Sequence, residues 1–221
     1  MAALDRSVTE KRLSIFPLAG AVLFPGMQLP LHIFEPRYRA LVSAALAGDR
    51  LIGMIQPRTL RTRADADEEP ALFDVGCLGR ITDVEALDDG RYNILLEGVA
   101  RFRCLRELEV ETPFRQISAM VESADASGEA ASFLASAERA ALEREARRFA
   151  ERQGYMVDWG AVSQLDDAAF VNGIAQVAPF DAAAKQAMLE ADGLSARAEL
   201  IMQLMQFFGR RDSDDDVVTL Q

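Results

Sequence analysis

Histidine and cysteine, the side chains that structural zinc sites and disulfides require, are rare in this 221-residue chain. His32 is the only histidine, and Cys77 and Cys104 are the only cysteines. A structural zinc site uses four cysteine or histidine ligands, and a disulfide framework needs more than two cysteines. We therefore expect no metal centre, a structural or surface role for the histidine, and two buried thiols.

The two lysines exclude two further kinds of active site. A phosphate-binding P-loop requires Gly-Lys followed by Ser or Thr, because the lysine must reach the β and γ phosphates. Here Glu10 precedes Lys11 and Ala184 precedes Lys185. A Ser-Lys hydrolase needs a partly buried lysine as its base, whereas Lys11 lies in a polar leader and Lys185 in a predicted helix. We therefore predict that the chain is not an enzyme and uses no cofactor.

Composition restricts the partners. The formal net charge of −11 opposes binding to nucleic acid, because phosphate contacts dominate that affinity. No segment approaches the roughly 18 consecutive apolar residues of a membrane span, and no apolar run follows the polar N-terminus. We expect a cytoplasmic protein with no membrane contact.

Aromatic and charged residues that could contact a partner gather in one stretch. Phe24, Phe34 and Tyr38 could line an apolar groove for exposed segments of unfolded protein, although core packing is the alternative for each. Glu35 and Arg37 surround a predicted helix N-terminus, where a carboxylate is electrostatically favoured. These two residues could bind a ligand or a peptide, or could join the helix to the sheet.

Two other groups are candidate binding residues. Arg80, Arg101 and Arg103, together with Arg91, could form a basic strip on one face of a sheet, or could simply point toward water. A predicted C-terminal helix carries methionines and phenylalanines, which suit either a bundle core or an adaptable binding surface. Those residues are Met202, Met205, Phe207 and Phe208.

Strands and a helix must position the aromatic stretch. Pro25-Gly26 is a turn dipeptide, and apolar residues alternate with polar ones from Met27 to Ile33, as in a half-buried strand. Pro30 lacks an N–H donor, so this strand should lie at a sheet edge or carry a bulge. From Pro36 to Gly48 the apolar residues have helical spacing, with proline at a favoured first-turn position.

Strand patterns continue to Val121 and predict about six or seven strands, enough for a small barrel or a strongly coiled sheet. Asp88-Asp89-Gly90 predicts a hairpin turn, because Asp-Gly can supply positive φ angles. Gly76 and Gly79 predict bulges or a sharp coil of the strand, and Gly98 predicts a bend.

Helical patterns replace the strand patterns after a small, polar segment at 122–130. Asp166 or Asp167, Asp181 and Ser195 are the predicted N-caps of three helices that follow a first one. We predict an α+β fold with a β-barrel subdomain at 14–121 and a helical bundle at 130–209. Residues 1–13 and 210–221 are predicted to be flexible tails.

Three separated blocks carry a resemblance to a known family. They read VLFPGMQLPLHIFEPRYRALV from Val22, GCLGRI with DGRYNILLEGVARFR from Gly76, and AQVAPFDAAAKQAMLEADGLSARAEL from Ala175. Together these blocks resemble the N-terminal, substrate-recognising domain of the ATP-dependent Lon protease. The resemblance implies a PUA-like β pseudo-barrel followed by a helical bundle, and it brings no catalytic residue.

The resemblance also implies what the chain would do. Lon proteases continue into an ATPase module and a Ser-Lys peptidase domain, so we expect a stand-alone Lon-domain protein. Our leading hypothesis is a non-catalytic module in protein quality control. It would bind unfolded or degradation-prone polypeptides, or a quality-control partner, in a groove on the barrel or between barrel and bundle. The alternatives are a small-molecule sensor and an RNA-binding PUA-like domain.

Overall fold

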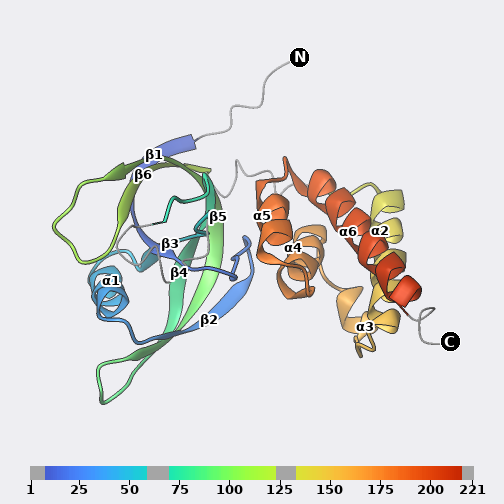
Figure 1. Cartoon of the computed structure of the whole chain (residues 1–221), viewed down its shortest axis with the longest axis horizontal. Helices are drawn as coiled ribbons and strands as arrows, with labels where there is room; N and C mark the ends of the chain where they lie inside the picture. The colour runs from blue at the N-terminus through green and yellow to red at the C-terminus, as the bar shows by residue number, and fades with distance from the viewer. Residues whose placement is uncertain (1–7, 59–69, 123–132, 216–221) are drawn as a thin grey trace.

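The computed structural model describes residues 8–58, 70–122 and 133–215. Six strands and one helix form the first part, and five helices form the second (Figure 1). The predicted α+β fold is confirmed. The elements of the first part are β1 Val8–Pro17, β2 Gln28–Ile33, α1 Pro36–Ala47, β3 Leu51–Ile55, β4 Val75–Ala86, β5 Tyr92–Leu108 and β6 Gln116–Glu122.

The sheet closes into a barrel because β5 is long enough to pair with three strands. The strand order is β2-β5-β4-β3-β1-β6, and an additional pairing joins β5 to β6. Tyr92 to Glu97 of β5 pair with β2, whereas Phe102 to Leu108 pair with β6. One strand therefore runs through Gly98, the position of the predicted bend, and continues to Leu108.

Strand β2 lies outside the closed ring and pairs only with β5, which confirms the predicted edge position. The amide of Gly98 donates to the carbonyl oxygen of Met27 at 2.8 Å. Met27 therefore directs its backbone carbonyl toward β5. In an antiparallel ladder, the residues at every second position from Gln28 onward then direct their backbone groups away from β5. These residues are Gln28, Pro30 and His32. Proline therefore occupies a position where the ladder needs no N–H.

The interior of the barrel holds an aromatic ring that two glycines accommodate. Phe102 belongs to a buried cluster with Ile15, Leu78 and Ile117. A Cβ at Gly53 would lie 3.2 Å from the Phe102 ring, and one at Gly76 would overlap both that ring and the Met54 carbonyl oxygen. Gly76 therefore serves close packing, whereas a register shift beside Gly79 confirms a bulge there. The predicted hairpin turn also forms, with φ of 77° at Gly90.

A second buried cluster extends from α1 across the outer face of the sheet into the helical part. Leu41 and Val42 of α1 belong to it, as do Leu96 of β5 and Phe149 and Met205 of the bundle. Barrel and bundle therefore share a continuous apolar core.

Five helices form the second part: α2 Ser136–Arg152, α3 Trp159–Val162, α4 Asp167–Val177, α5 Ala182–Glu190 and α6 Leu194–Asp215. Asp166 and Asp181 cap α4 and α5, each accepting from a backbone amide at 2.7 Å, as predicted. Ser195 is not a cap, because α6 begins one residue earlier and the Ser195 hydroxyl donates to Glu138. None of the described helices is both long and apolar enough to cross a membrane.

Both expected tails are partly ordered. β1 begins at Val8 rather than near residue 14, because residues 8–14 pair with β6 along its whole length. Helix α6 continues past Gly209 to Asp215, since one glycine weakens a helix by about 1 kcal/mol without ending it. The predicted boundary at 122–130 lies almost entirely outside the described residues.

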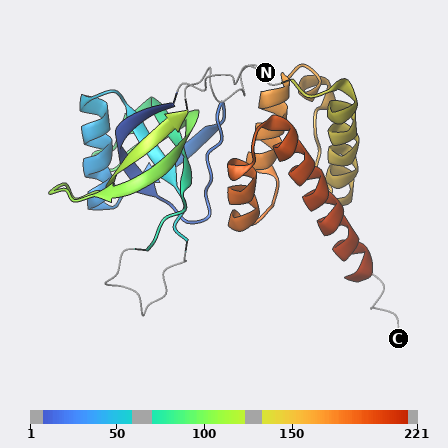
Figure 2. The same cartoon turned by 90° about the horizontal axis from the view of Figure 1, so that it is seen from above.

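The five helices stand beside the barrel in an order that matters for the site. α4 and α5 face the barrel, whereas α2 lies on the far side and α6 crosses between them (Figures 1 and 2). Among the described helices, α2 and α6 share the most extensive packing.

Replacing Gly76 tests the packing of the barrel interior. We expect Gly76→Ala to lower the free energy of unfolding by about 2 kcal/mol or more, because the added methyl meets a backbone oxygen that cannot rotate away. Gly48→Ala is the matched control, since its Cβ would lie no closer than 3.6 Å to any other atom. Urea unfolding of both variants measures the difference, and equal stability of the two would contradict this account.

Candidate functional site

Two aromatic residues expected on a binding surface are buried. Phe24 is fully buried, and the guanidinium of Arg197 lies 5.5 Å from its ring centre. Tyr38 packs edge-on against Phe16, with ring centres 4.1 Å apart, and its hydroxyl donates to the carbonyl oxygen of Pro17 at 3.3 Å. The prediction that Phe24 and Tyr38 line an open groove is wrong, and both follow the core-packing alternative. The bundle covers Phe24, whereas Tyr38 packs from α1 against Phe16 of β1.

The neighbouring candidates remain at the surface but do not form a pocket with them. Phe34 is 61% exposed and stacks on His32 with ring centres 6.3 Å apart. Glu35 and Arg37 form an ion pair of 2.9 Å, and the Arg37 guanidinium lies 4.5 Å from the Tyr38 ring. These contacts are local to the start of α1, so a ligand-binding role for Glu35 and Arg37 stays a prediction.

The expected basic strip is interrupted at Arg101. Arg80 and Arg103 are exposed, and Arg80 donates to the carbonyl oxygen of Asp49 at 3.4 Å. Arg101 is only 5% exposed. Strand alternation alone could not reveal this difference, because the bundle covers the Arg101 side chain.

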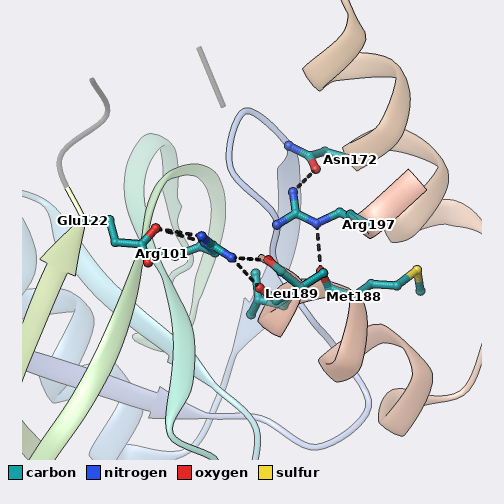
Figure 3. Close-up of polar contacts among 7 residues, drawn as sticks. Arg101, Glu122, Asn172, Met188, Leu189 and Arg197 are labelled. Atoms are coloured by element: carbon teal, nitrogen blue, oxygen red, sulfur yellow. Dashed lines mark hydrogen bonds and ion pairs between the residues drawn. The ribbon is translucent and has the colours of Figure 1, made fainter. Parts of the chain in front are cut away.

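Arg101 joins the barrel to the C-terminal end of α5 (Figure 3). Its guanidinium donates to Glu122 Oε2 at 3.0 Å and to the carbonyl oxygens of Leu189 and Ala191 at 3.2 and 2.6 Å. The last carbonyls of a helix have no partner within it, and a cation is favoured there by the helix dipole. Arg101 is therefore a buried structural link between β5, β6 and α5.

Other links between the two parts also run from side chain to backbone. Gln176 of α4 accepts from the amide of Phe24 at 3.2 Å and donates to the carbonyl of Gln28 at 2.6 Å. Asn172 donates to the carbonyl of Pro25 at 3.1 Å and accepts from Arg197 of α6 at 2.5 Å. Because backbone positions are fixed by the fold, these bonds hold α4 at one place on the barrel.

An apolar groove lies within the bundle, on the side of α4 that faces α2. Its volume is about 290 Å³. Its lining residues share apolar or aromatic character and come from α2, α3, α4, α6 and the connecting loops. They are Ala146, Phe149, Ala150, Tyr155, Val157, Trp159, Val162, Leu165, Ala169, Phe170, Gly173, Ile174, Val177, Ala178, Pro179 and Met205.

The rim of the groove is unusually apolar for a surface. Val177 is 81% exposed and Tyr155 is 50% exposed, and Val157 and Leu165 are also exposed. Met156, beside the groove, is fully exposed. Contiguous exposed apolar residues of this size mark interaction sites, whereas single ones are ordinary.

An ion pair fixes the two walls of the groove. Arg139 of α2 pairs with Asp167, the first residue of α4, and its guanidinium lies 5.1 Å from the ring of Phe170 in the lining. Asp167 also accepts from the amide of Leu134 at 2.9 Å. Burial by itself would raise the pKa of Asp167, but the bonds from Arg139 and Leu134 outweigh it and lower that pKa.

Sequence reasoning identified Met205 as a minority candidate but missed the rest of the groove. Helix α3 was not predicted, and it supplies Trp159 and Val162. The available signal was the segment Tyr155 to Trp159, where four large apolar residues lie between two helices. Such residues in a connection indicate either a contact with the core or a binding surface.

The residues with catalytic potential lie apart from the groove. His32 is exposed, with Nδ1 2.7 Å from Asn93 Oδ1, as expected for a surface residue. Lys185 of α5 donates to the carbonyl of Gln176 at 2.6 Å, and burial lowers its pKa. Cys77 is buried as predicted, whereas Cys104 is half-buried, and burial raises its pKa.

The sequence of this chain matches a known protein family. The family model for the substrate-binding domain of ATP-dependent protease La (Lon) matches residues 12–206. The chain belongs to the Lon substrate-binding domain family. The resemblance carried by the three sequence blocks is therefore confirmed.

Curated relatives include Lon protease 2 of Myxococcus xanthus, 28% identical over 87% of this chain and 23% of that protein. Lon protease 4 of Sorangium cellulosum is 32% identical over 73% of this chain and 19% of that protein. The chain thus spans about a fifth of the length of these relatives.

Solved structures support the fold of this Lon-family chain. A Lon N-terminal domain protein from Xanthomonas campestris matches with a TM-score of 0.64 and 21% identity, covering 87% of this chain and 98% of that one. The N-terminal domain of Mycobacterium avium complex Lon protease matches with a TM-score of 0.63 and 16% identity, covering 89% and 98%.

Removing Arg101 tests its structural role. We expect Arg101→Ala to lower the free energy of unfolding by about 3 kcal/mol or more, because it leaves Glu122 and two helix carbonyls without their cation. Arg103→Ala, on the same strand but exposed, should change it by no more than about 0.5 kcal/mol. Chemical denaturation checks both values. Similar losses for the two variants would show that the buried contacts of Arg101 contribute no more to stability than those of an exposed arginine.

Acidification tests the ion pair between the groove walls. The pKa of Asp167 is lower in the folded chain than the ordinary value of 3.8, so ionised Asp167 stabilises the fold above that value. This contribution disappears as the pH falls through the lower, folded-state pKa. We therefore expect Asp167→Asn to be less stable than the parent at pH 7, with the difference shrinking below about pH 4. Urea unfolding across pH measures it, and a constant difference would contradict the assignment.

Proposed function

We propose that this chain is a non-catalytic module that binds apolar segments of unfolded or degradation-prone polypeptides in the groove of its helical bundle. The observation that carries the proposal is the groove itself, an apolar cavity whose rim exposes Tyr155, Leu165 and Val177. Unfolded chains differ from folded ones in displaying large apolar side chains. A rigid apolar cavity open to solvent recognises that difference.

The size of the groove sets the expected affinity. Burying one large apolar side chain contributes about 1.5 to 3 kcal/mol, so two such side chains contribute about 3 to 6 kcal/mol before the entropy of association is subtracted. A free energy of about 3 to 6 kcal/mol corresponds to dissociation constants between about 6 mM and about 0.04 mM, and the entropy of association weakens binding further. Binding would be weak and reversible for one segment, which suits a module that samples many chains.

Family membership supports a place in protein quality control. The relatives are named as Lon proteases, and the matching family is described as their substrate-binding domain. The proposed cytoplasmic location is supported by the free thiols of Cys77 and Cys104, which a reducing compartment maintains.

A small apolar molecule is a second candidate occupant. The groove volume of about 290 Å³ lies at the lower end of the range of ligand pockets, and such pockets are predominantly apolar. Stabilisation of the folded chain by a small ligand that also displaces unfolded polypeptide would favour this function. The RNA-binding alternative is opposed by the net charge of −11.

A charge placed on the groove rim tests the polypeptide-binding function. Val177→Lys puts an ammonium where an apolar segment would be buried, yet a lysine at the end of α4 suits the helix dipole and should preserve the fold. We expect it to weaken binding of a reduced, carboxymethylated protein by about tenfold or more. Fluorescence anisotropy of the labelled unfolded protein measures the affinity.

The matched control introduces the same charge at an exposed apolar residue of the barrel. Leu105 is 49% exposed and lies on β5, away from the groove. Leu105→Lys should leave the affinity within about twofold of the parent. Equal binding by the parent and Val177→Lys, or no binding by the parent, would rule out the groove as the site.

A further inference from the structure

We infer that the groove receives the apolar face of an amphipathic α-helix rather than an extended segment. This inference rests on the proposed polypeptide-binding function and names the class of segment that the groove selects. Three features support it. They are the apolar chemistry of the lining, the helical spacing of the apolar residues on α4, and the small number of free backbone groups on the edge strand β2.

The lining offers almost nothing to a ligand's backbone. Among the described lining side chains, only the Tyr155 hydroxyl and the Trp159 indole N–H are conventional hydrogen-bonding groups. Most of the lining stands on helices, whose backbone groups bond to one another. An extended segment that entered the groove would lose the hydrogen bonds between its backbone and water, whereas a helix keeps the hydrogen bonds within its own backbone.

The α4 wall has the pattern of a helix-packing face. Its groove residues are Ala169, Phe170, Gly173, Ile174 and Val177. They recur at intervals of three to four residues, so they form one stripe on the helix. The stripe spans eight residue steps, or roughly 12 Å at about 1.5 Å per residue. A ligand helix of two to three turns would match this length with apolar residues at i, i+3 or i+4, and i+7.

The outermost strand provides a poor alternative for an extended ligand. An added strand would pair with the free backbone groups of β2, which belong to Gln28, Pro30 and His32. Pro30 has no N–H, and the carbonyl of Gln28 already accepts from Gln176 of α4. Only His32 would keep both backbone groups available along this edge, so strand addition there is disfavoured.

Charges around the groove also fit an amphipathic helix. Arg147 pairs with Glu143 at 2.5 Å and lies 4.3 Å from the ring centre of Trp159. A positive and a negative side chain therefore lie next to each other at this rim, and their charges neutralise each other. They complement a polar face of mixed charge and do not select an acidic or a basic ligand. Binding should accordingly change little with salt concentration.

The experiment compares two synthetic peptides of about 16 residues with the same apolar side chains. One is held helical by side-chain lactams on its polar face and presents leucine and phenylalanine at i, i+3, i+4 and i+7. The other has two prolines on the polar face, which prevent the helix. Anisotropy titrations use the full chain, its Val177→Lys variant and its Leu105→Lys variant.

We expect the helical peptide to bind the parent at least tenfold more tightly than the proline peptide. Val177→Lys should abolish that preference, Leu105→Lys should retain it, and raising the salt from 50 to 500 mM should change the affinity less than threefold. Circular dichroism of the variants establishes that they remain folded.

Three outcomes would overturn the inference. Equal or tighter binding of the proline peptide, with unfolded protein still bound, would reject helix selection while leaving the polypeptide-binding function in place. Failure of both peptides and of unfolded protein to bind would reject that function as well. Concentration-dependent dimerisation that Val177→Lys removes, seen by sedimentation, would assign the groove to a second copy of this chain.

Discussion

The buried guanidinium of Arg101 fixes the arrangement of the whole molecule. A cation taken out of water is tolerable only when its donors are satisfied, and here Glu122 and two carbonyls at the end of α5 satisfy them. Those partners come from β6 and from a helix almost ninety residues away in sequence. A bundle docked in another orientation would leave the charge unpaired. The link therefore supplies specificity of placement, whereas the shared apolar core supplies most of the attraction.

Because of this placement, α4 contacts the barrel with one side and lines the groove with another. α4 uses its barrel-facing side to hold Pro25 and Gln28 through Asn172 and Gln176, and it presents its other side to the groove. The groove wall is thus attached to a closed barrel, which has few free edges and little freedom to deform. A site built on a helix that is fixed in this way is preorganised, so a ligand loses less free energy in ordering it.

Sequence reasoning succeeded where local chemistry decides the structure. Pro30 predicted an edge strand because its ring removes a donor, and Asp166 and Asp181 predicted helix starts because a carboxylate accepts from free amides. It failed where burial depends on distant elements. Phe24, in the loop before β2, and Arg101, on β5, look like surface candidates from their local sequence, and only docking of the bundle covers them. The groove was missed for the same reason, since each of its residues reads as ordinary core until several helices leave a space between them.

The exposed apolar residues on the rim argue that this space is used. Val177 is 81% exposed, so it gains little of the burial that stabilises a folded chain, and Tyr155 and Leu165 gain only part of it. Such a patch also promotes self-association, which a net charge of −11 opposes by repulsion between copies. High charge elsewhere on the surface allows a protein to keep an apolar opening without aggregating. The combination of an apolar rim, an apolar floor and a wall fixed to the barrel supports the proposal of a partner that covers this opening with an apolar face of its own.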